Sequence, residues 1–529
     1  MIVFLLLMAV VILLCILANR FASRIGMPVL ICFIALGMIF GVDGPFGIDY
    51  NDFQITEKIC SVALAFVMFY GGFGTKWETA KPVAAKAVML SGLGVVVTAL
   101  FTTVFCGIVL RMDWLESFLI GSVLSCTDAA SVFSILRSKK LALKYGTDSL
   151  LEIESGSNDP VAYMLTTIAI AMMTGTDTSI GSMLFAQIVF GIGIGVCVAA
   201  LALRILQKTS IITESMDTIF VIAVVLISYA LPSLIGGNGY LSVYLTGIIL
   251  GNSNIRNKRV LVPFFDGITN LAQITIFFFL GLLSVPHRMP SVLPMASAIA
   301  LFLLFLGRPL MVMALTWPFK ARFREQLCVS WAGLRGASSI VFAIYGVSCV
   351  SDLQYDLFHI VFMVALLSVA VQGTMLPAVA RKLEMLDAEA DVLKTFNDYQ
   401  EDDSLTLMRM YIPEGHNWEN KMISQVSMPA DALALMIKRD GETLIPRGDT
   451  HIRKGDNIIL SVPAFKEKGD INLREIVIDK KHGWCGKDIE ELQLPQQVLI
   501  AMIRRGEENI IPRGHSVIEE GDVLVVYDS

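Results

Sequence analysis

The sequence predicts an all-α polytopic membrane domain followed by a cytoplasmic α/β domain that is duplicated in tandem. The chain of 529 residues is 55% hydrophobic and only 17% charged, whereas soluble proteins average about 25% charged residues. Long apolar runs fill residues 1–385. The formal charge is +2 over residues 1–390 and −8 over residues 391–529. This composition excludes a wholly soluble enzyme.

Apolar runs predict thirteen membrane spans. A hydrocarbon core of about 30 Å requires about 20 apolar residues in a helix, and fewer in a short or broken one. The amino terminus lacks the basic segment and cleavage site of a signal peptide and is expected to be the first span. The spans are expected at about residues 2–19, 27–41, 58–73, 84–110, 114–136, 149–174, 181–206, 216–232, 237–251, 264–284, 293–317, 326–348 and 355–380.

Lys and Arg residues are concentrated in alternate loops. Of the 24 in residues 1–390, nineteen fall in one set of loops, and only Lys58, Arg111 and Arg288 fall in the other. The positive-inside rule places the cation-rich loops in the cytoplasm. We therefore expect the amino terminus outside and the acidic tail in the cytoplasm.

Five of the charged side chains within the predicted spans stand out as candidates for an ion path, because ionisable groups inside a bilayer cost several kcal/mol and generally mark such a path. They are Asp128, Glu154, Asp159, Arg308 and Arg335. At about 1.5 Å per residue, Asp128 lies about 21 Å below the outer face and Asp159 about 15 Å above the inner face. Both positions are near the midplane. A structural ion pair is the alternative for any single charge, but five charges on four spans favour a site.

The sixth span carries a cluster of polar side chains. Glu154 and Asn158, like Ser155 and Asp159, are four residues apart, so each pair shares a helix face. Pro160 has no N–H to donate to the carbonyl four residues earlier, which frees that oxygen for another partner.

Two antiparallel spans are interrupted by small polar residues, at 125–131 in the fifth span and at 333–339 in the twelfth. Paired broken helices in opposite halves indicate an inverted repeat whose broken helices cross at a midplane ion site. Asp128 and Arg335 could supply the charges that exposed carbonyls and half-helix ends require. Close helix packing is the alternative for either span alone.

Exchange of a small cation for a proton requires one acid that can hold either, but not both at once. We expect Asp159 to be this acid. Together with Ser155, Thr127 and nearby carbonyls, it offers the oxygen ligands that hard monovalent cations prefer. Asn158 can ligate but cannot titrate, so a single titrating carboxylate predicts an electroneutral cycle.

The motifs Thr127-Asp128, 154–160, Gly307-Arg308-Pro309 and 333–336 resemble the monovalent cation:proton antiporter-1 family, which includes NhaP-type K+/H+ and Na+/H+ antiporters. The resemblance covers most of residues 1–385. It implies a homodimer in the bacterial inner membrane with thirteen helices, separate dimerisation and core domains, and elevator-type alternating access.

The resemblance also implies roles for individual residues. Thr127, Ser155 and Asp159 would hold the cation, while Asn158, Glu154 and Arg335 would form a supporting polar network. We assign Asp128 to the same ion site and Arg308 to the supporting charges.

The acidic tail contains an internal repeat. Residues 410–462 align without a gap with 476–528, with 18 identities over 53 positions, far above the chance rate of about one in seventeen. Each unit predicts a strand, at 434–438 and 500–504, then a Pro-Arg-Gly turn and a second strand, at 458–462 and 524–527.

This repeat resembles the C-terminal lobe of regulator-of-K+-conductance domains (RCK-C, also TrkA-C). Such lobes pair and bind small ligands, in some relatives a cyclic dinucleotide. Arg439, Arg447, Arg505 and Arg513 could contact phosphates, although solvated surface arginines are the alternative. No glycine-rich nucleotide loop precedes the repeat, which argues against NAD sensing.

We therefore expect a membrane exchanger domain over 1–385, a linker over 386–406, and RCK-C-like domains over 407–466 and 467–529. The predicted protein is a secondary transporter, not an enzyme. It exchanges a monovalent cation (K+ favoured over Na+) for H+, requires no cofactor and binds no nucleic acid. The nine cysteines form no C-x-x-C pair, so no metal or redox centre is expected. A ligand-gated cation channel is the alternative, since a channel needs no titratable carboxylate.

Overall fold

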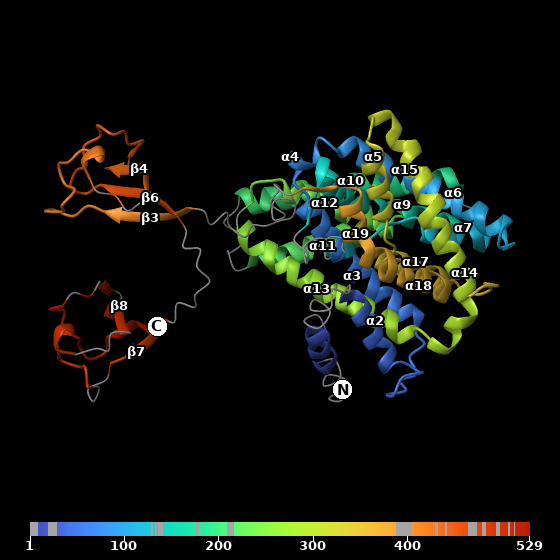
Figure 1. Cartoon of the computed structure of the whole chain (residues 1–529), viewed down its shortest axis with the longest axis horizontal. Helices are drawn as coiled ribbons and strands as arrows, with labels where there is room; N and C mark the ends of the chain where they lie inside the picture. Colours follow the sequence, from blue (N-terminus) through green and yellow to red (C-terminus); the bar gives the residue numbers. More distant parts are fainter. Residues whose placement is uncertain are drawn as a thin grey trace. The chain divides into compact units, whose positions relative to one another are not determined.

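The chain forms two compact units, residues 1–400 and 401–529, in a computed structural model. The first consists mainly of helices and the second of small sheets (Figure 1). The structure describes residues 9–18, 29–128, 131–132, 135, 141–175, 179–208, 216–255, 257–387, 405–426, 428, 432–439, 442–463, 473–478, 483–492, 498–505, 508–510, 512 and 514–528.

Within the described residues, seven helical stretches are long and apolar enough to cross a membrane. They are Phe53–Gly74 (α3), Ala84–Ile108 (α5 and α6), Ile180–Gln207 (in α10), Asp217–Leu234 (α11), Val260–Leu283 (in α13), Pro286–Phe319 (with α14 and α15) and Leu357–Lys382 (α18 to α19). Shorter apolar helices are Ala9–Ala18, Val29–Phe40 (α2), Trp114–Val123 (α7), Gly239–Gly251 (α12) and Ala337–Cys349 (α17). The helical membrane domain is confirmed, while the count of thirteen spans stays a prediction.

The site described below depends mainly on α9 (Thr147–Thr174), a continuous helix of 28 residues. It carries four acidic residues in its first half and is not among the seven apolar stretches. The other helices are α4 (Trp77–Ala80), α5 (Ala84–Ser91), α6 (Leu93–Ile108), α10 (Ile180–Lys208), α13 (Lys258–Leu283), α14 (Met289–Phe302), α15 (Arg308–Thr316), α16 (Phe323–Trp331), α18 (Leu357–Leu367) and α19 (Thr374–Lys382).

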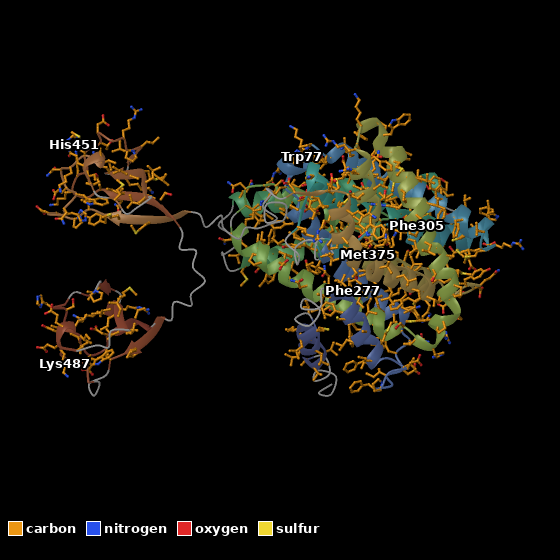
Figure 2. All side chains as sticks on the ribbon, in the orientation of Figure 1. Trp77, Phe277, Phe305, Met375, His451 and Lys487 are labelled. Atoms are coloured by element: carbon orange, nitrogen blue, oxygen red, sulfur yellow. The ribbon has the colours of Figure 1, made fainter. Side chains whose placement is uncertain are left out.

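Two hydrophobic clusters hold the helices together. The larger buries aromatic side chains such as Phe69, Phe265 and Phe342, and the smaller lies around Leu150 and Leu376. Helix α3 packs against α12, α13 and α17, and α9 packs against α5 and α7. Other large apolar side chains point outward, as Phe305 and Met375 do (Figure 2). Apolar side chains on both the inside and the outside are expected of a domain that lies in lipid.

Both predicted interruptions are present. Helix α7 ends at Val123, residues 124–128 are not helical, and Ser131 is helical again. Helix α16 ends at Trp331, and α17 begins only at Ala337.

The tail contains two sheets of identical topology. Strands β3 (Leu405–Tyr411), β6 (Asn457–Pro463), β4 (Leu433–Arg439) and β5 (Glu442–Leu444) form the first sheet in that order. Strands β7 (Leu473–Val477), β10 (Val523–Asp528), β8 (Val498–Arg505) and β9 (Glu508–Ile510) form the second. All described pairings within these sheets are antiparallel. The four predicted strands are confirmed as β4, β8, β6 and β10.

The duplication extends to the hydrophobic cores. The first core is built on Ile412, Ile437, Ile452, Ile458 and Leu460. The second contains Ile478, Ile503, Ile518, Leu524 and Val526, which are the positions equivalent by the repeat. Gly455 and its equivalent Gly521 both have positive φ, 85° and 88°, which explains the glycine in the Gly-Asp turn of each unit.

Candidate functional site

The polar segment of α9 is buried. Glu154, Ser155, Asn158 and Asp159 are each less than one-tenth exposed. Pro160 lies inside the helix, and its carbonyl accepts a hydrogen bond of 2.8 Å from the Asn238 amide at the start of α12. The polar face of α9 is thus tied to a neighbouring helix beside the carboxylate of Asp159.

Thr127, in the interruption after α7, meets this segment directly. The Ser155 hydroxyl donates to the Thr127 carbonyl at 2.5 Å, and the Asn158 amide nitrogen donates to the Thr127 hydroxyl at 2.6 Å. Asn158 Oδ1 and Asp159 Oδ1 are buried and have no hydrogen-bond partner among the described residues. Buried oxygens of this kind are costly unless something binds them, so the cluster is suited to hold a cation or a proton.

The two interruptions are joined through their backbones. The Asp128 amide donates to the Leu334 carbonyl at 2.8 Å, and Arg335 donates from Nη1 to the Cys126 carbonyl at 2.5 Å. The Asp128 carboxylate accepts the Ser131 hydroxyl at 2.5 Å and its amide at 3.3 Å. Asp128 therefore caps the helical segment that follows the break, and Arg335 satisfies a carbonyl that the break exposes.

Glu154 is paired with Arg308. The arginine contacts both carboxylate oxygens, at 2.7 and 2.9 Å, and both side chains are almost fully buried. One of these contacts, from Nη2 to Oε2, is a hydrogen bond, and a buried charge-assisted contact of this kind is strong. Within the polar network, the direct ion pair of Glu154 is with Arg308, whereas Arg335 donates to the interruption after α7. The supporting role expected of Asn158, Glu154 and Arg335 stays a prediction.

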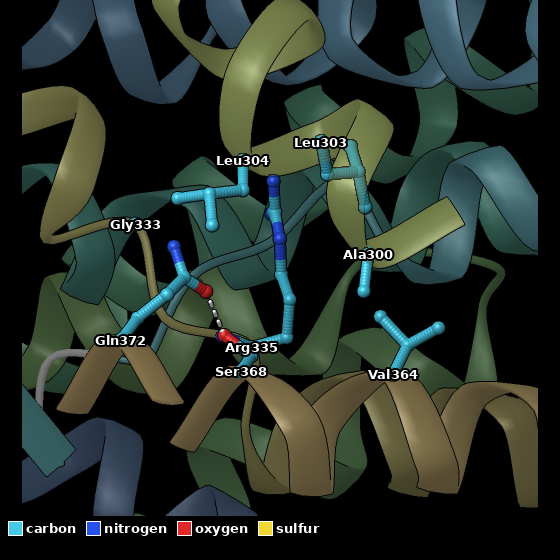
Figure 3. A pocket seen from close by; sticks show the side chains of 8 residues that line it. All are labelled: Ala300, Leu303, Leu304, Gly333, Arg335, Val364, Ser368 and Gln372. Atoms are coloured by element: carbon cyan, nitrogen blue, oxygen red, sulfur yellow. Dashed lines mark hydrogen bonds between the residues drawn. The ribbon is translucent and has the colours of Figure 1, made fainter. Parts of the chain in front are cut away.

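A small pocket lies beside Arg335 (Figure 3). The Ser368 hydroxyl accepts the Arg335 amide at 3.0 Å and donates to Gln372. Two π-helical turns, Leu303–Gly307 and Ser368–Gly373, contribute to the lining, and such turns are frequent at functional sites. The free space of about 10 Å³ is at the lower limit for one water molecule.

Sequence reasoning missed several of these contacts. Cys126 and Leu334 contact the charged residues through their carbonyls and Ser368 through its hydroxyl, and Gln372 in turn accepts a hydrogen bond from Ser368. Cys126 and Leu334 lie within the two predicted interruptions, whereas no signal in the sequence identified Ser368 or Gln372.

Two of the candidate tail arginines form ion pairs within their own lobes. Arg439 donates through Nε and Nη2 to Asp456, both at 2.7 Å, and Arg505 contacts Asp522 in the same way at 2.8 Å. The hydrogen bond from Arg505 lowers the pKa of Asp522. Burial alone would raise the pKa of Asp456, but hydrogen bonds from Arg439 and the Arg453 amide lower it overall.

The remaining two candidates differ in what the structure shows. Arg447 is exposed on the turn after β5, whereas Arg513 lies outside the described residues. A role of any of these arginines in ligand binding stays a prediction.

Comparisons with known proteins agree with this architecture. The family model described as "Sodium/hydrogen exchanger, transmembrane" matches residues 9–382, and the TrkA-C domain matches 407–464 and 473–527. The K(+)/H(+) antiporter NhaP of Alkalimonas amylolytica is 33% identical over 86% of this chain and 80% of its own. NhaP2 of Shewanella baltica, also a K(+)/H(+) antiporter by name, is 31% identical over 83% of this chain and 77% of its own.

The fold also matches a solved structure. The sodium proton antiporter MjNhaP1 of Methanocaldococcus jannaschii gives a TM-score of 0.63 at 22% identity, over 72% of this chain and 99% of that one. At this identity the match shows a shared fold. Taken with the family match over most of the membrane unit, it means that this chain belongs to the sodium/hydrogen exchanger family of transmembrane cation/proton antiporters, with two TrkA-C domains appended.

Proposed function

We propose that the chain exchanges K+ for H+ at the cluster of Asp159, Asn158, Ser155 and Thr127, with Na+ as the alternative cargo. The observation that carries this proposal concerns two buried oxygens, Asn158 Oδ1 and Asp159 Oδ1, which have no hydrogen-bond partner within the part of the chain that the structure describes. They lie beside Thr127, whose contacts with α9 hold the interruption in place. The relatives named as K+/H+ antiporters favour K+. A Synechocystis relative at 27% identity is named a low-affinity Na+/H+ antiporter.

The charges of the cluster support a one-for-one cycle. Arg308 and Arg335 bring two positive charges, and Asp128, Glu154 and Asp159 bring three negative ones. One monovalent cation, or one proton on Asp159, makes the buried cluster neutral, whereas both together would leave an excess charge that is costly in a low-dielectric interior. Binding is therefore mutually exclusive, and the cycle moves no net charge.

We further infer thirteen crossings arranged as an inverted repeat, with the amino terminus outside and the tail in the cytoplasm of a bacterial inner membrane, and a homodimeric assembly. The domains run over residues 1–385, 386–406, 407–466 and 467–529, and the tail regulates exchange. A cyclic dinucleotide remains the proposed class of tail ligand. Arg447 and Arg513 are its candidate phosphate contacts, because Arg439 and Arg505 already bind aspartates.

The test is proton movement in everted vesicles, followed with a ΔpH-sensitive dye after addition of KCl, NaCl or LiCl. We expect dequenching at the lowest concentration with KCl, and no net charge displacement when the same membranes are placed on a supported-membrane electrode. Cation flux without proton movement would instead support the channel alternative, which none of the named relatives favours.

A further inference from the structure

A short strand follows α19 and is docked on the membrane unit. After α19, Glu384 takes a positive φ of 56°, and the Met385 amide turns back to the Ala380 carbonyl at 2.9 Å. Residues Leu386–Asp387 (β2) then pair antiparallel with Ala142–Leu143 (β1). The strand that leads towards the tail is therefore attached to a segment more than 240 residues earlier in the sequence.

This contact is anchored by buried side chains. Met385 is 1% exposed, and Leu143 opposite β2 is 3% exposed. Both belong to the same hydrophobic cluster as Leu150 and Leu151 of α9 and Leu376 of α19. The Lys144 amide adds a hydrogen bond of 2.8 Å to the Met385 carbonyl.

Strand β1 is joined to the ion-carrying helix by a short, well-fixed turn. Residues Lys144–Gly146 form one 3-10 turn, after which α9 begins at Thr147. The Thr147 hydroxyl donates to the Lys144 carbonyl at 2.7 Å, and the Arg322 guanidinium lies 4.4 Å from the centre of the Tyr145 ring. Since α9 is continuous from Thr147 past Asp159, a displacement of β1 is transmitted about 18 Å along a rigid helix to Asp159.

The ladder between β1 and β2 is short. Within the described residues two residue pairs form the ladder, and Asp387 adds a small electrostatic repulsion to Asp148 in the first turn of α9. Each cross-strand pair stabilises a sheet only modestly, and like charges weaken the pairing. Burial of Met385 is therefore the main contact that release of the strand has to break.

We propose that residues 385–387 are the connection through which the tail controls cation exchange: the strand docks on the segment that begins α9, and the state of the tail decides whether it stays docked. This inference rests on the proposed regulatory function of the tail. It adds the place in the membrane unit where regulation acts, and it needs no contact between the tail and the ion site.

The test locks the strand in place in the full chain. Ala142 and Asp387 are opposite each other in the ladder, a position at which paired cysteines can form a disulfide. The variant Ala142→Cys/Asp387→Cys is oxidised in vesicles, and bond formation is confirmed by the loss of two maleimide-reactive thiols. Cation/proton exchange is compared with and without residues 400–529, before and after reduction. The single-cysteine variants, treated identically, are the controls.

We expect deletion of residues 400–529 to change the cation concentration for half-maximal exchange in the reduced protein, and to have no effect in the locked one. A deletion effect of equal size in both states would overturn the inference but leave tail regulation intact. No deletion effect in the parent chain would overturn tail regulation and this inference together, while exchange itself would stand.

A second variant tests the inference if the disulfide between positions 142 and 387 does not form. Met385→Ser places a hydroxyl in the buried anchor position and releases the strand, so its exchange should match that of the deleted chain and should not change further on deletion. Met375→Ser, on the exposed side of α19 (47% exposed), is the matched control and should behave as the parent does. A Met385→Ser protein that still responds fully to deletion would contradict the inference.

Discussion

A methyl group at Gly336 would lie 1.9 Å from Oδ2 of Asp128. The backbone at the end of one interruption is thus in direct contact with the carboxylate of the other. Together with the hydrogen bond between the Asp128 amide and the Leu334 carbonyl, this contact fixes how the two broken segments cross. The glycine is required for space, since any β-carbon at this position displaces the Asp128 side chain.

Gly336→Ala should therefore impair both folding and exchange. We expect a stability loss of about 1–3 kcal/mol from overpacking and a severe loss of exchange, measured by thermal unfolding of purified protein and by dye dequenching in vesicles. Gly193→Ala is the control, because nothing lies within 4 Å of its added methyl group. Equal behaviour of the two variants would show that the crossing tolerates a side chain.

The pair of Arg308 and Glu154 provides a second prediction. Removing one partner of a buried ion pair leaves an uncompensated charge and costs about 3–5 kcal/mol, so Glu154→Leu and Arg308→Met should each lower the unfolding temperature strongly. The double variant should lose less than the sum of the two. Arg324→Gln, which breaks an exposed pair with Glu384, should cost at most about 1 kcal/mol. Additive losses in the double variant would mean that the two residues are independent.

The ion pairs between arginine and aspartate in the tail predict that the stability of each lobe depends on pH. Because the folded-state pKa of Asp456 is below its unfolded value, which is about 3.9, the stabilisation is complete at neutral pH. It is lost as the pH falls through the folded-state pKa. Susceptibility of the first lobe to pepsin should therefore rise steeply below about pH 4.

The variant Asp456→Asn tests the same pair at neutral pH. It should lose about 1.5–3 kcal/mol of lobe stability, seen as faster hydrogen exchange in β6 of the full-length protein. Asp449→Asn, at an exposed position in the same lobe, should not change this exchange. If β6 exchanges its amide hydrogens as slowly in Asp456→Asn as in the parent, the pair of Arg439 and Asp456 does not stabilise the lobe.

Deletion of the tail provides a further prediction. Without residues 400–529, the pH or ligand dependence of exchange should change while the order of K+, Na+ and Li+ stays the same, because the proposed cation ligands all lie in the membrane unit. Dye dequenching over a range of pH with each salt measures both properties. A reversed ion order would place selectivity in the tail.

Residue chemistry was sufficient to locate the polar cluster. A bilayer makes buried charges and polar breaks costly, so Asp159, Asn158 and the two interruptions are conspicuous in an apolar sequence. Their meeting could be inferred from depth along the helices. The structure brings Thr127, Ser155 and Asn158 into direct contact.

The sequence could not predict which partner each buried charged side chain has, because this depends on the rotation of each helix about its axis. A π-helical turn directly before Arg308 inserts an extra residue into the helical repeat and alters which side Arg308 faces. Such a turn cannot be recognised in the sequence. Arg335 binds a backbone carbonyl of Cys126, which any residue type could provide. For these reasons the direct pair of Glu154 with Arg308 is visible only in the structure.

In the tail, too, some features could be predicted from the sequence and others could not. Its duplication, four strands and Gly-Asp turns could be predicted from the repeat. Strand β3 was missed because the aligned repeat begins at residue 410, inside that strand. The pairing of β1 with β2 involves only two residues from each segment, too few for any periodicity to be visible.

The central claim is that one buried carboxylate carries either the cation or the proton, and Asp159→Asn tests it most directly. The variant should insert and unfold normally, because the amide keeps the shape of the side chain. Dye dequenching in everted vesicles should be abolished with KCl, NaCl and LiCl alike. Asp266→Asn, which alters another acid on a membrane helix, should exchange as the parent does. Substantial cation/proton exchange by Asp159→Asn would contradict the account.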